Sequence, residues 1–512
     1  MAVLVGEAQA AELGQRFQVC VVRGLTLGSL EEVARLHVAV GLLVPGAGPE
    51  TSERAAIAML ERGVVRNSLR DPVPSGPALI DVRFAEPGRD GDLPPCGSAR
   101  RGHAEPAIVL GVPRGGEQPN DRRYPVVVIG RGYRGLLTSD STRIPGLVSI
   151  DDIAPTALGR DDSLGSQPSA DALGKLRTLD RRIHDNNEWR SRTASWLEAT
   201  VAALAVVSGI AAVLGVGALL LANLVLGAVD VPPVLAFAVL LAAALAGLPV
   251  ARLVRRRVAV AALLAAVPAL CLFSFLVDER WVALSPLGPT QNARFYGITN
   301  LLETLLLVPV LAAAALLRRP IAFALVAALA FVTIAGSRFG ADGGGAVVLG
   351  VGFAVLGALL AGAGRRAAAA ASGAGIALVL ALVAVDALTG ASSHVTRALH
   401  GGPGGLARDL ADRVELSWER ATAEASTAIT IAVALGVFVL LALRLLRARV
   451  PARTAALPVA FLAAIATSLV VNDSPKDVTL AGLAGYLAVE SLALGSRSAA
   501  GGVGRRLRAR RS

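Results

Sequence analysis

Cysteine, histidine and aromatic residues are scarce in this chain of 512 residues. Its three cysteines, Cys20, Cys96 and Cys271, are too few for a disulfide framework or a cysteine-rich zinc cluster. The sequence allows a single Cys20–Cys96 disulfide. Cys271 lies within an apolar run. Aromatic residues make up 4% of the chain, too few for the stacking platforms of a nucleic-acid groove. The net charge of +11 therefore does not indicate nucleic-acid binding.

Apolar residues, by contrast, are abundant and unevenly distributed. They make up 54% of the chain, with a mean hydropathy of +0.59, against roughly 45–50% in ordinary globular proteins. Residues 1–190 mix charged residues with Pro and Gly, while Ala/Leu/Val runs dominate from Ala199 onward. We expect a soluble domain over 1–190, a multi-span transmembrane domain over 194–497 and a basic cytoplasmic tail over 498–512.

The apolar runs are long enough to cross a bilayer, which takes about 20 residues of helix. The region 194–228 could form one long tilted helix or a hairpin of two. We therefore predict an all-α bundle of about 10–11 helices. The clear candidates for single spans are Pro232–Ala251, Val258–Val277, Leu301–Leu317, Ile321–Gly336, Ala346–Gly364, Gly373–Leu388, Ala428–Leu446, Leu457–Val471 and Val478–Leu494.

Arginine clusters between these runs indicate which loops face the cytoplasm. They lie at 252–257, 318–320, 365–366 and 444–453, and at the C-terminus. A hairpin at 194–228 then places the N-terminal domain outside the cytoplasm, and a single helix places it inside. The charges that precede the first span favour the inside. The triplet Ala8-Gln9-Ala10 has the form of a signal-peptidase site and favours the outside.

We expect a cell-membrane protein with an extracytoplasmic N-terminal domain and a cytoplasmic C-terminus. On this interpretation the first ten residues are the end of a truncated signal peptide; a disordered N-terminus is the alternative.

The soluble region alternates apolar strands with helical stretches. This alternation predicts an α/β domain with a mostly parallel sheet. Ser52 is placed to cap the start of one helix, and Asp151 and Asp152 precede another. We predict strands at Phe17–Val22, Gly41–Val44, Ala107–Val112, Val126–Ile129 and Gly146–Ile150, and helices at Leu30–Ala39, Ser52–Arg62 and from Ile153 to Leu158.

The stretch from Val126 to Leu158 resembles the C-terminal part of the alkaline phosphatase superfamily, as found in cofactor-independent phosphoglycerate mutases. It carries a strand, a Ser141-Thr142 pair and the helix-opening sequence Asp-Ile-Ala-Pro-Thr-Ala-Leu. The resemblance also places Thr51 and Ser52 where members of that superfamily have a nucleophile at the start of a helix.

The chain departs from the superfamily at its metal ligands. Members hold two metal ions with Asp and His residues, and these ions activate the nucleophile. Here Arg23 stands at the position of the first Asp, and Asp140 stands at the position of a His. A hydroxyl without a base or metal is a poor nucleophile, so we expect a degenerate, non-catalytic domain without a cofactor. The alternative is a divalent metal in a rearranged site of Asp140, Asp151 or Asp152 with Thr51.

The polar segment from Asp278 to Asn300 is the candidate binding site of the membrane half. Arg294 could clamp a phosphate or carboxylate, and Tyr296 could stack on a sugar. Glu303 is expected about one turn inside the bilayer, where an acid is costly and usually functional. The turn at 337–345 is expected on the same face. The predicted substrate-binding residues are Asn292, Arg294, Tyr296, Asn300, Glu303, Arg338 and Asp342.

These features lead to one functional hypothesis and two alternatives. We expect a bacterial cell-envelope protein that binds, and transfers or moves, a phosphate-bearing lipid or glycan carrier. Its partners would be membrane lipid and a lipid-linked or envelope glycan, with no nucleic acid. The alternatives are a metal-dependent phosphatase or phosphotransferase with a rearranged site, and a secondary transporter with a regulatory soluble domain.

Overall fold

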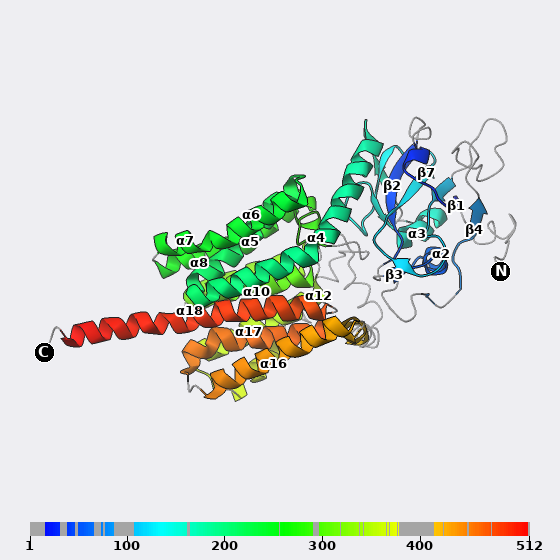
Figure 1. The fold of residues 1–512 in the computed structure, drawn as a ribbon. Helices are drawn as coiled ribbons and strands as arrows, with labels where there is room; N and C mark the ends of the chain where they lie inside the picture. The colour runs from blue at the N-terminus through cyan, green and yellow to red at the C-terminus, as the bar shows by residue number, and fades with distance from the viewer. Residues whose placement is uncertain are drawn as a thin grey trace. The chain divides into compact units, whose positions relative to one another are not determined.

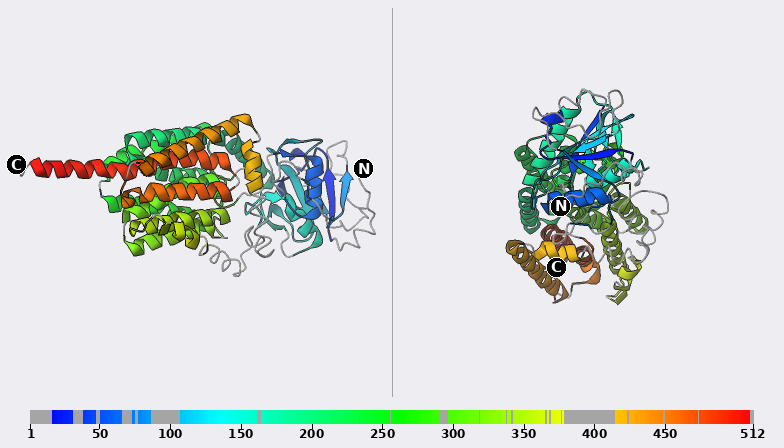
Figure 2. Two further views of the ribbon diagram at one scale, coloured as in Figure 1. Left: turned by 90° about the horizontal axis from the view of Figure 1, so that it is seen from below. Right: turned by 90° about the vertical axis from the view of Figure 1, so that its right-hand side faces the viewer.

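The computed structural model divides the chain into two compact units (Figures 1 and 2). The first comprises Met1–Glu188 with Pro289–Tyr296, and the second comprises Trp189–Gly288 with Gly297–Ser512. We call them the α/β unit and the helical unit. The structure describes residues 16–30, 38–46, 50–65, 73–74, 77–85, 107–160, 164–254, 256–289, 296–317, 319–336, 338–340, 342–364, 366–367, 369–375, 377, 414–422, 424–447, 450–472 and 474–509.

The α/β unit is built on an eight-stranded sheet with the order β10-β8-β2-β7-β5-β1-β4, in which β9 pairs with β2. A separate two-stranded sheet joins β3 to β6. The strands are β1 (Gln18–Val22), β2 (Val38–Val44), β3 (Glu50–Thr51), β4 (Val82–Ala85), β5 (Ala107–Leu110), β6 (Gln118–Pro119), β7 (Tyr124–Ile129), β8 (Gly135–Thr138), β9 (Leu147–Ser149) and β10 (Gly165–Gln167).

The sheet is mixed, so the prediction of a mostly parallel sheet was wrong. β1 runs parallel to β4 and β5, but β7 runs antiparallel to both β2 and β5. The connection from β5 to β7, residues 111–123, contains no helix, and a parallel return usually needs one. The apolar run of β7 gave no sign of its direction, because a strand buried on both faces reads the same either way.

Two of the expected helices are present and one was misplaced. α2 (Glu53–Arg62) begins after Ser52, whose side chain accepts a hydrogen bond from Ala55 N, and it ends at Gly63 with φ 59°. α3 (Ile153–Leu158) follows the short 3-10 helix Ile150–Asp152. The helix predicted at Leu30–Ala39 is wrong at its end, because Val38 and Ala39 belong to the fully buried strand β2. Residues 31–37 of that prediction lie outside the described residues.

The helical unit is that of a multi-pass membrane protein. Among the described residues, eight helices are long and apolar enough to span a bilayer, and Pro320–Ala335 is a shorter apolar helix. The predicted span Gly373–Leu388 lies largely outside the described part of the chain. The helices are α4 (Ala172–Val207), α5 (Gly209–Ala228), α6 (Pro233–Leu245), α7 (Gly247–Leu253), α8 (Arg257–Val277), α9 (Arg280–Ala283), α10 (Asn300–Leu317), α11 (Pro320–Ala335), α12 (Gly343–Leu360), α16 (Ala425–Arg447), α17 (Ala452–Val471) and α18 (Pro475–Ala509).

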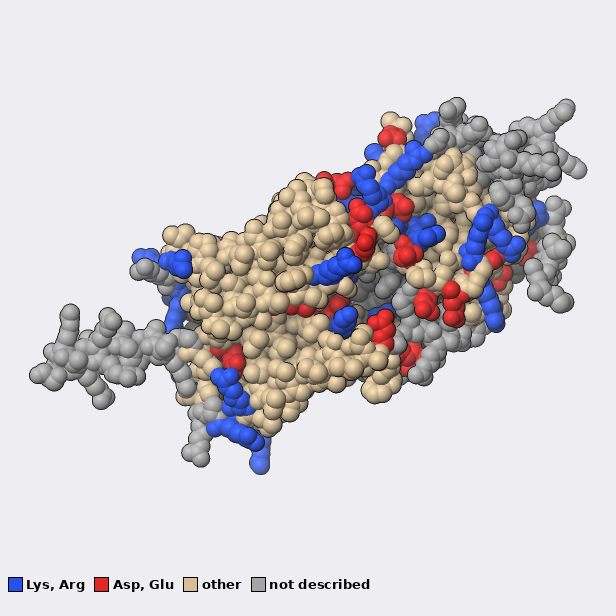
Figure 3. All heavy atoms as spheres, in the orientation of Figure 1, with Lys and Arg blue, Asp and Glu red and all other residues tan. Residues whose placement is uncertain are grey.

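The surface of the helical unit fits a lipid environment. On the face drawn in Figure 3 a broad uncharged area covers its middle, and Lys and Arg gather where α18 leaves the bundle. Large apolar side chains are exposed on the surface of this unit. Ile321, for example, is 77% exposed. Exposed apolar area of this extent is not stable in water but is natural against lipid tails.

The second half of α4 runs along α18 inside the helical unit. Arg190 donates to the carbonyl of Gly288 at 3.0 Å and pairs with Asp477, near the start of α18, at 3.4 Å. Further along both helices, Ser491 donates to the carbonyl of Ala205 at 2.7 Å. The two helices therefore run side by side in the same direction.

α5 then returns toward the end of the unit from which α4 came. The chain breaks at Ser208, which caps α5. Near the far end of α5, Asn223 donates to Ser285 at 2.8 Å and accepts from Leu287 N at 3.0 Å. Ser285 and Leu287 lie next to Gly288 in sequence, so the end of α5 lies near Arg190. Residues 194–228 thus form parts of two helices that run in opposite directions, of which α5 is a candidate span.

Candidate functional site

A polar cluster interrupts the apolar core where α10, α12 and α17 meet. Glu303 lies in the first turn of α10 and is 0% exposed. Asn472, directly after α17, donates from Nδ2 to Glu303 Oε2 at 2.7 Å and to Ser468 Oγ at 2.8 Å. Asp342 caps α12 by accepting from Gly345 N at 3.0 Å. We call Glu303, Asp342, Ser468 and Asn472 the acid–amide cluster.

The two acids of this cluster interact electrostatically inside the bundle. Asp342 is 3% exposed and Asn472 is 2% exposed, and Asp342 exerts its charge on the Glu303 carboxyl. Like charges held close together out of water are unfavourable unless a proton, a cation or a donor group lies between them. The two carboxyl groups therefore need a proton, a cation or a donor group close to them.

One oxygen of Glu303 has no partner among the described residues. Its Oε1 atom is buried and makes no hydrogen bond to any of them, whereas Oε2 accepts from Asn472. Leaving a buried polar atom unpaired costs about 1–3 kcal/mol. Native proteins rarely keep such an atom without a functional reason.

Backbone contacts hold the two acid-bearing segments together. Ile298, just before α10, donates its N–H to the carbonyl of Gly340 at 3.0 Å, and Asp342 N donates to the carbonyl of Ile334 at 3.0 Å. At Gly344 an added Cβ would overlap Asn472 Oδ1. Glycine at this position thus allows α12 to begin directly against the end of α17.

The other predicted substrate-binding residues have different surroundings. Tyr296 is 3% exposed, and the Arg143 guanidinium carbon lies 4.1 Å from its ring centroid within the α/β unit. The carbonyl of Asn300 accepts from Thr304 Oγ1 at 2.7 Å in the first turn of α10. Arg338 is exposed. Asn292 and Arg294 lie outside the described residues.

Sequence reasoning found both acids but missed their partners. Asn472 and Ser468 belong to α17 or its C-cap, and Asn472 stands 169 residues from Glu303 in the sequence. A weak signal was available, since the polar residues Asn472 and Asp473 directly follow an apolar span in the sequence. Nothing in the sequence paired them with Glu303.

In the α/β unit, the two hydroxyl candidates have different surroundings. Ser52 serves as the N-cap of α2, the structural role that its position predicts. Thr51 is 3% exposed, and its Oγ1 atom has no hydrogen-bond partner in the part of the chain that the structure describes. Arg23, at the position where the superfamily has an Asp, forms an ion pair of 2.7 Å with Glu53 in the first turn of α2. A cation therefore occupies the place that the resemblance gives to a metal ligand.

Of the three candidate metal ligands, Asp152 is committed to hydrogen bonds within the fold. Its carboxylate accepts from Ser139 Oγ at 2.6 Å, Ser141 Oγ at 2.5 Å and Ser149 N at 2.8 Å. Burial and the neighbouring Asp151 raise the pKa of Asp152 to about 7, although these hydrogen bonds act in the opposite direction. Asp140 is exposed and Asp151 is half-buried.

No cluster of three or more His, Cys, Asp and Glu side chains suited to a metal ion occurs among the described residues. The divalent metal considered from the sequence stays a prediction, since part of the chain lies outside that set.

The comparisons with known proteins leave the family unassigned. No protein-family model, curated protein or solved structure matches the chain. The resemblance of residues 126–158 to the alkaline phosphatase superfamily therefore stays a prediction, and the chemistry of the acid–amide cluster is the firmest basis for a function.

Proposed function

We propose that the chain is a multi-pass membrane protein that binds and moves a phosphate-bearing lipid or glycan carrier, with the acid–amide cluster as its polar binding site. The observation that carries this proposal is Glu303, wholly buried in an apolar bundle with Oε1 unpaired. Acids inside membrane helices usually mark a substrate or ion pathway.

The chemistry of the cluster favours the sugar part of such a carrier. Glu303 and Asp342 supply acceptor oxygens, which suit the hydroxyl donors of a glycan and repel a phosphate. The phosphate needs cationic partners, and Arg338, four residues before Asp342, and Arg294 are of the right type. The cluster is closed in this structure, so the ends of α10, α12 and α17 must part before a ligand of this size enters.

The location of the α/β unit forms part of the same proposal. Cys20 in β1 is disulfide-bonded, and disulfides persist mainly outside the reducing cytosol. The candidate partner Cys96 lies outside the described residues. The hairpin of α4 and α5, together with arginine-rich loops in the cytoplasm, also favours an extracytoplasmic α/β unit. We assign this unit a non-catalytic role.

Ligand binding by the full chain in detergent micelles tests the proposal. Three probes separate the contributions: a polyprenyl-phosphate-linked disaccharide, the same polyprenyl phosphate without sugar, and the free disaccharide. We expect the linked probe to bind most tightly, and Glu303→Gln to reduce its affinity to that of the sugar-free lipid. Equal affinity of the wild type for the linked and sugar-free lipids would contradict the assignment of the cluster to a glycan.

A further inference from the structure

A second buried polar group lies further along α18. Tyr486 is 0% exposed and Glu490, one turn later on the same helix face, is 6% exposed. The Tyr486 hydroxyl is buried without a hydrogen bond of normal geometry, and Glu490 and Arg444 are the charged groups that act on it. Phe438 covers the ring, with centroids 6.3 Å apart. The proposed function does not use this pair.

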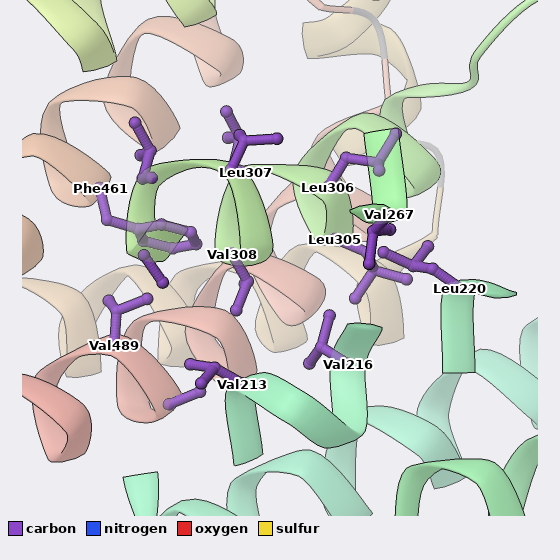
Figure 4. Packing of buried hydrophobic residues seen from close by; sticks show 14 of the residues in the cluster. Val213, Val216, Leu220, Val267, Leu305, Leu306, Leu307, Val308, Phe461 and Val489 are labelled. Carbon is purple, nitrogen blue, oxygen red and sulfur yellow. The ribbon is translucent and has the colours of Figure 1, made fainter. Parts of the chain in front are cut away.

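An apolar layer lies between this pair and the acid–amide cluster. An added Cβ at Gly485 would come within 2.7 Å of Phe461 Cζ and 2.9 Å of Val308 Cγ2, so α18 packs closely on α17 and α10 at this level. Val308 and Phe461 are each 0% exposed. Figure 4 shows both side chains, with Val489, in the packed interior between these helices.

The spacing along the helices places the apolar layer midway between the two acids. Val308 lies five residues after Glu303 on α10, and Gly485 lies five residues before Glu490 on α18. At 1.5 Å per residue each interval is about 7.5 Å. The acids are thus separated by about 15 Å along the bundle, roughly half of the hydrocarbon core.

We propose that Glu303 and Glu490 are two cation-binding positions on one path through the helical unit. In this structure the path is closed by the layer of Val308, Phe461 and Gly485. The inference rests on the proposed function. It identifies the ion whose flow would drive carrier movement as a proton or a monovalent metal cation, both of which a carboxylate binds. Beside Glu303 the path is faced by Asp342, Asn472 and Ser468, and beside Glu490 it is faced by Tyr486 and Arg444.

Ion flux into proteoliposomes that contain the full chain tests this path. A potassium diffusion potential drives uptake, with a pH-sensitive dye in choline buffer as the proton arm and ²²Na⁺ uptake as the metal-cation arm. We expect flux in one of the two arms, slowed at least tenfold by Glu303→Gln and by Glu490→Gln. Glu424→Gln is the matched control, because Glu424 is exposed and accepts from Ser426 Oγ at 3.4 Å outside the cluster, and it should keep wild-type flux.

Opening the apolar layer supplies a gain-of-function test that does not depend on loss of activity. Val308→Ala, and the larger truncation Phe461→Ala, should raise the leak of the same cation at least threefold. Adding Glu490→Gln to Val308→Ala should abolish that leak. If Val308→Ala fails to raise flux, or if its leak persists without Glu490, the path is contradicted.

Carrier binding measured on the same vesicles separates this inference from the proposed function. Glu490→Gln should stop flux while leaving binding of the lipid-linked disaccharide unchanged. Wild-type flux in Glu490→Gln, or no flux of either cation in the wild type, would overturn the path even if the carrier binds. Flux that depends on both acids without carrier binding would overturn only the carrier assignment.

Discussion

Asp152 in the α/β unit and Glu303 in the helical unit are both buried acids, but their surroundings differ. Asp152 has hydrogen bonds on both oxygens, from Ser139, Ser141 and Ser149. One oxygen of Glu303 accepts from Asn472, and the other has no partner among the residues that the structure describes. An acid that is fully bonded fixes a loop, whereas one that keeps a free acceptor is available to a ligand.

The same contrast extends to the hydroxyls of the α/β unit. Thr142 donates to the carbonyl of Leu147 at 2.6 Å, and Thr156 donates to the carbonyl of Asp152 at 2.7 Å. Thr51 and Ser169 are exceptions, since their buried Oγ atoms have no partner among the described residues. Thr142, Thr156 and Asp152 are therefore used to hold the segment from β8 to α3.

Replacing Glu303 should have the largest functional effect. Glu303→Gln keeps the size of the side chain but replaces one carboxyl oxygen, an acceptor, with an amide group that only donates. We therefore expect about 100-fold weaker carrier binding, roughly 3 kcal/mol. Titration of the purified full chain measures the affinity. Asp152→Asn is the matched substitution in the other unit and should leave binding within about twofold. A similar loss in both variants would show that the two acids do not differ in role.

Removing the disulfide should destabilise one unit and spare the other. Cys20→Ser should lower the stability of the α/β unit by about 2–4 kcal/mol, because an unbridged unfolded chain has more conformational entropy. Hydrogen exchange in the full chain, resolved by mass spectrometry, should show faster exchange in β1 and β5. The helices α10 and α17 should exchange at wild-type rates. Unchanged exchange in β1 would contradict a stabilising bridge.

Asp152 should make the stability of the α/β unit depend on pH. Its pKa is raised to about 7 by burial, against about 3.9 in an unfolded chain. Between these values the native state binds a proton that the unfolded state lacks, so the unfolding free energy falls as pH rises from about 4 to about 7. Exchange rates of α3 should follow this trend, and Asp152→Asn should flatten it. A profile that is the same in both proteins would refute the assignment.

The smallest expected change concerns Ser52. Ser52→Ala removes the N-cap of α2 and should cost about 1 kcal/mol, seen as faster exchange in the first turn of that helix. Carrier binding should not change. Loss of phosphate-ester hydrolysis with Ser52→Ala but not with Ser52→Thr would instead identify a nucleophile. The contrast between a non-catalytic α/β unit and a ligand-binding helical unit would then be wrong.

Local features of the sequence predicted local structure well. The cap at Ser52 set the start of α2, and the apolar runs marked β1, β5, β7 and most of the membrane helices within a few residues. The position of Glu303 within a long apolar run also marked it as a costly acid inside a predicted span.

What the sequence could not provide were relations between distant segments. The direction of β7 depends on which strands it joins, and its apolar pattern is the same for both directions. The pairing of Glu303 with Asn472, and the closeness of Gly485 to Val308 and Phe461, arise from helix packing. In each case the determining contacts join residues far apart in the chain, and no local pattern encodes them.

Native mass spectrometry of the full chain purified from its membrane tests the central claim, that Glu303 belongs to a ligand site and Asp152 does not. The account predicts that the wild type and Asp152→Asn carry the same phosphate-bearing lipid or glycan, and that Glu303→Gln emerges without it. Retention of that species by Glu303→Gln at wild-type occupancy would contradict the claim.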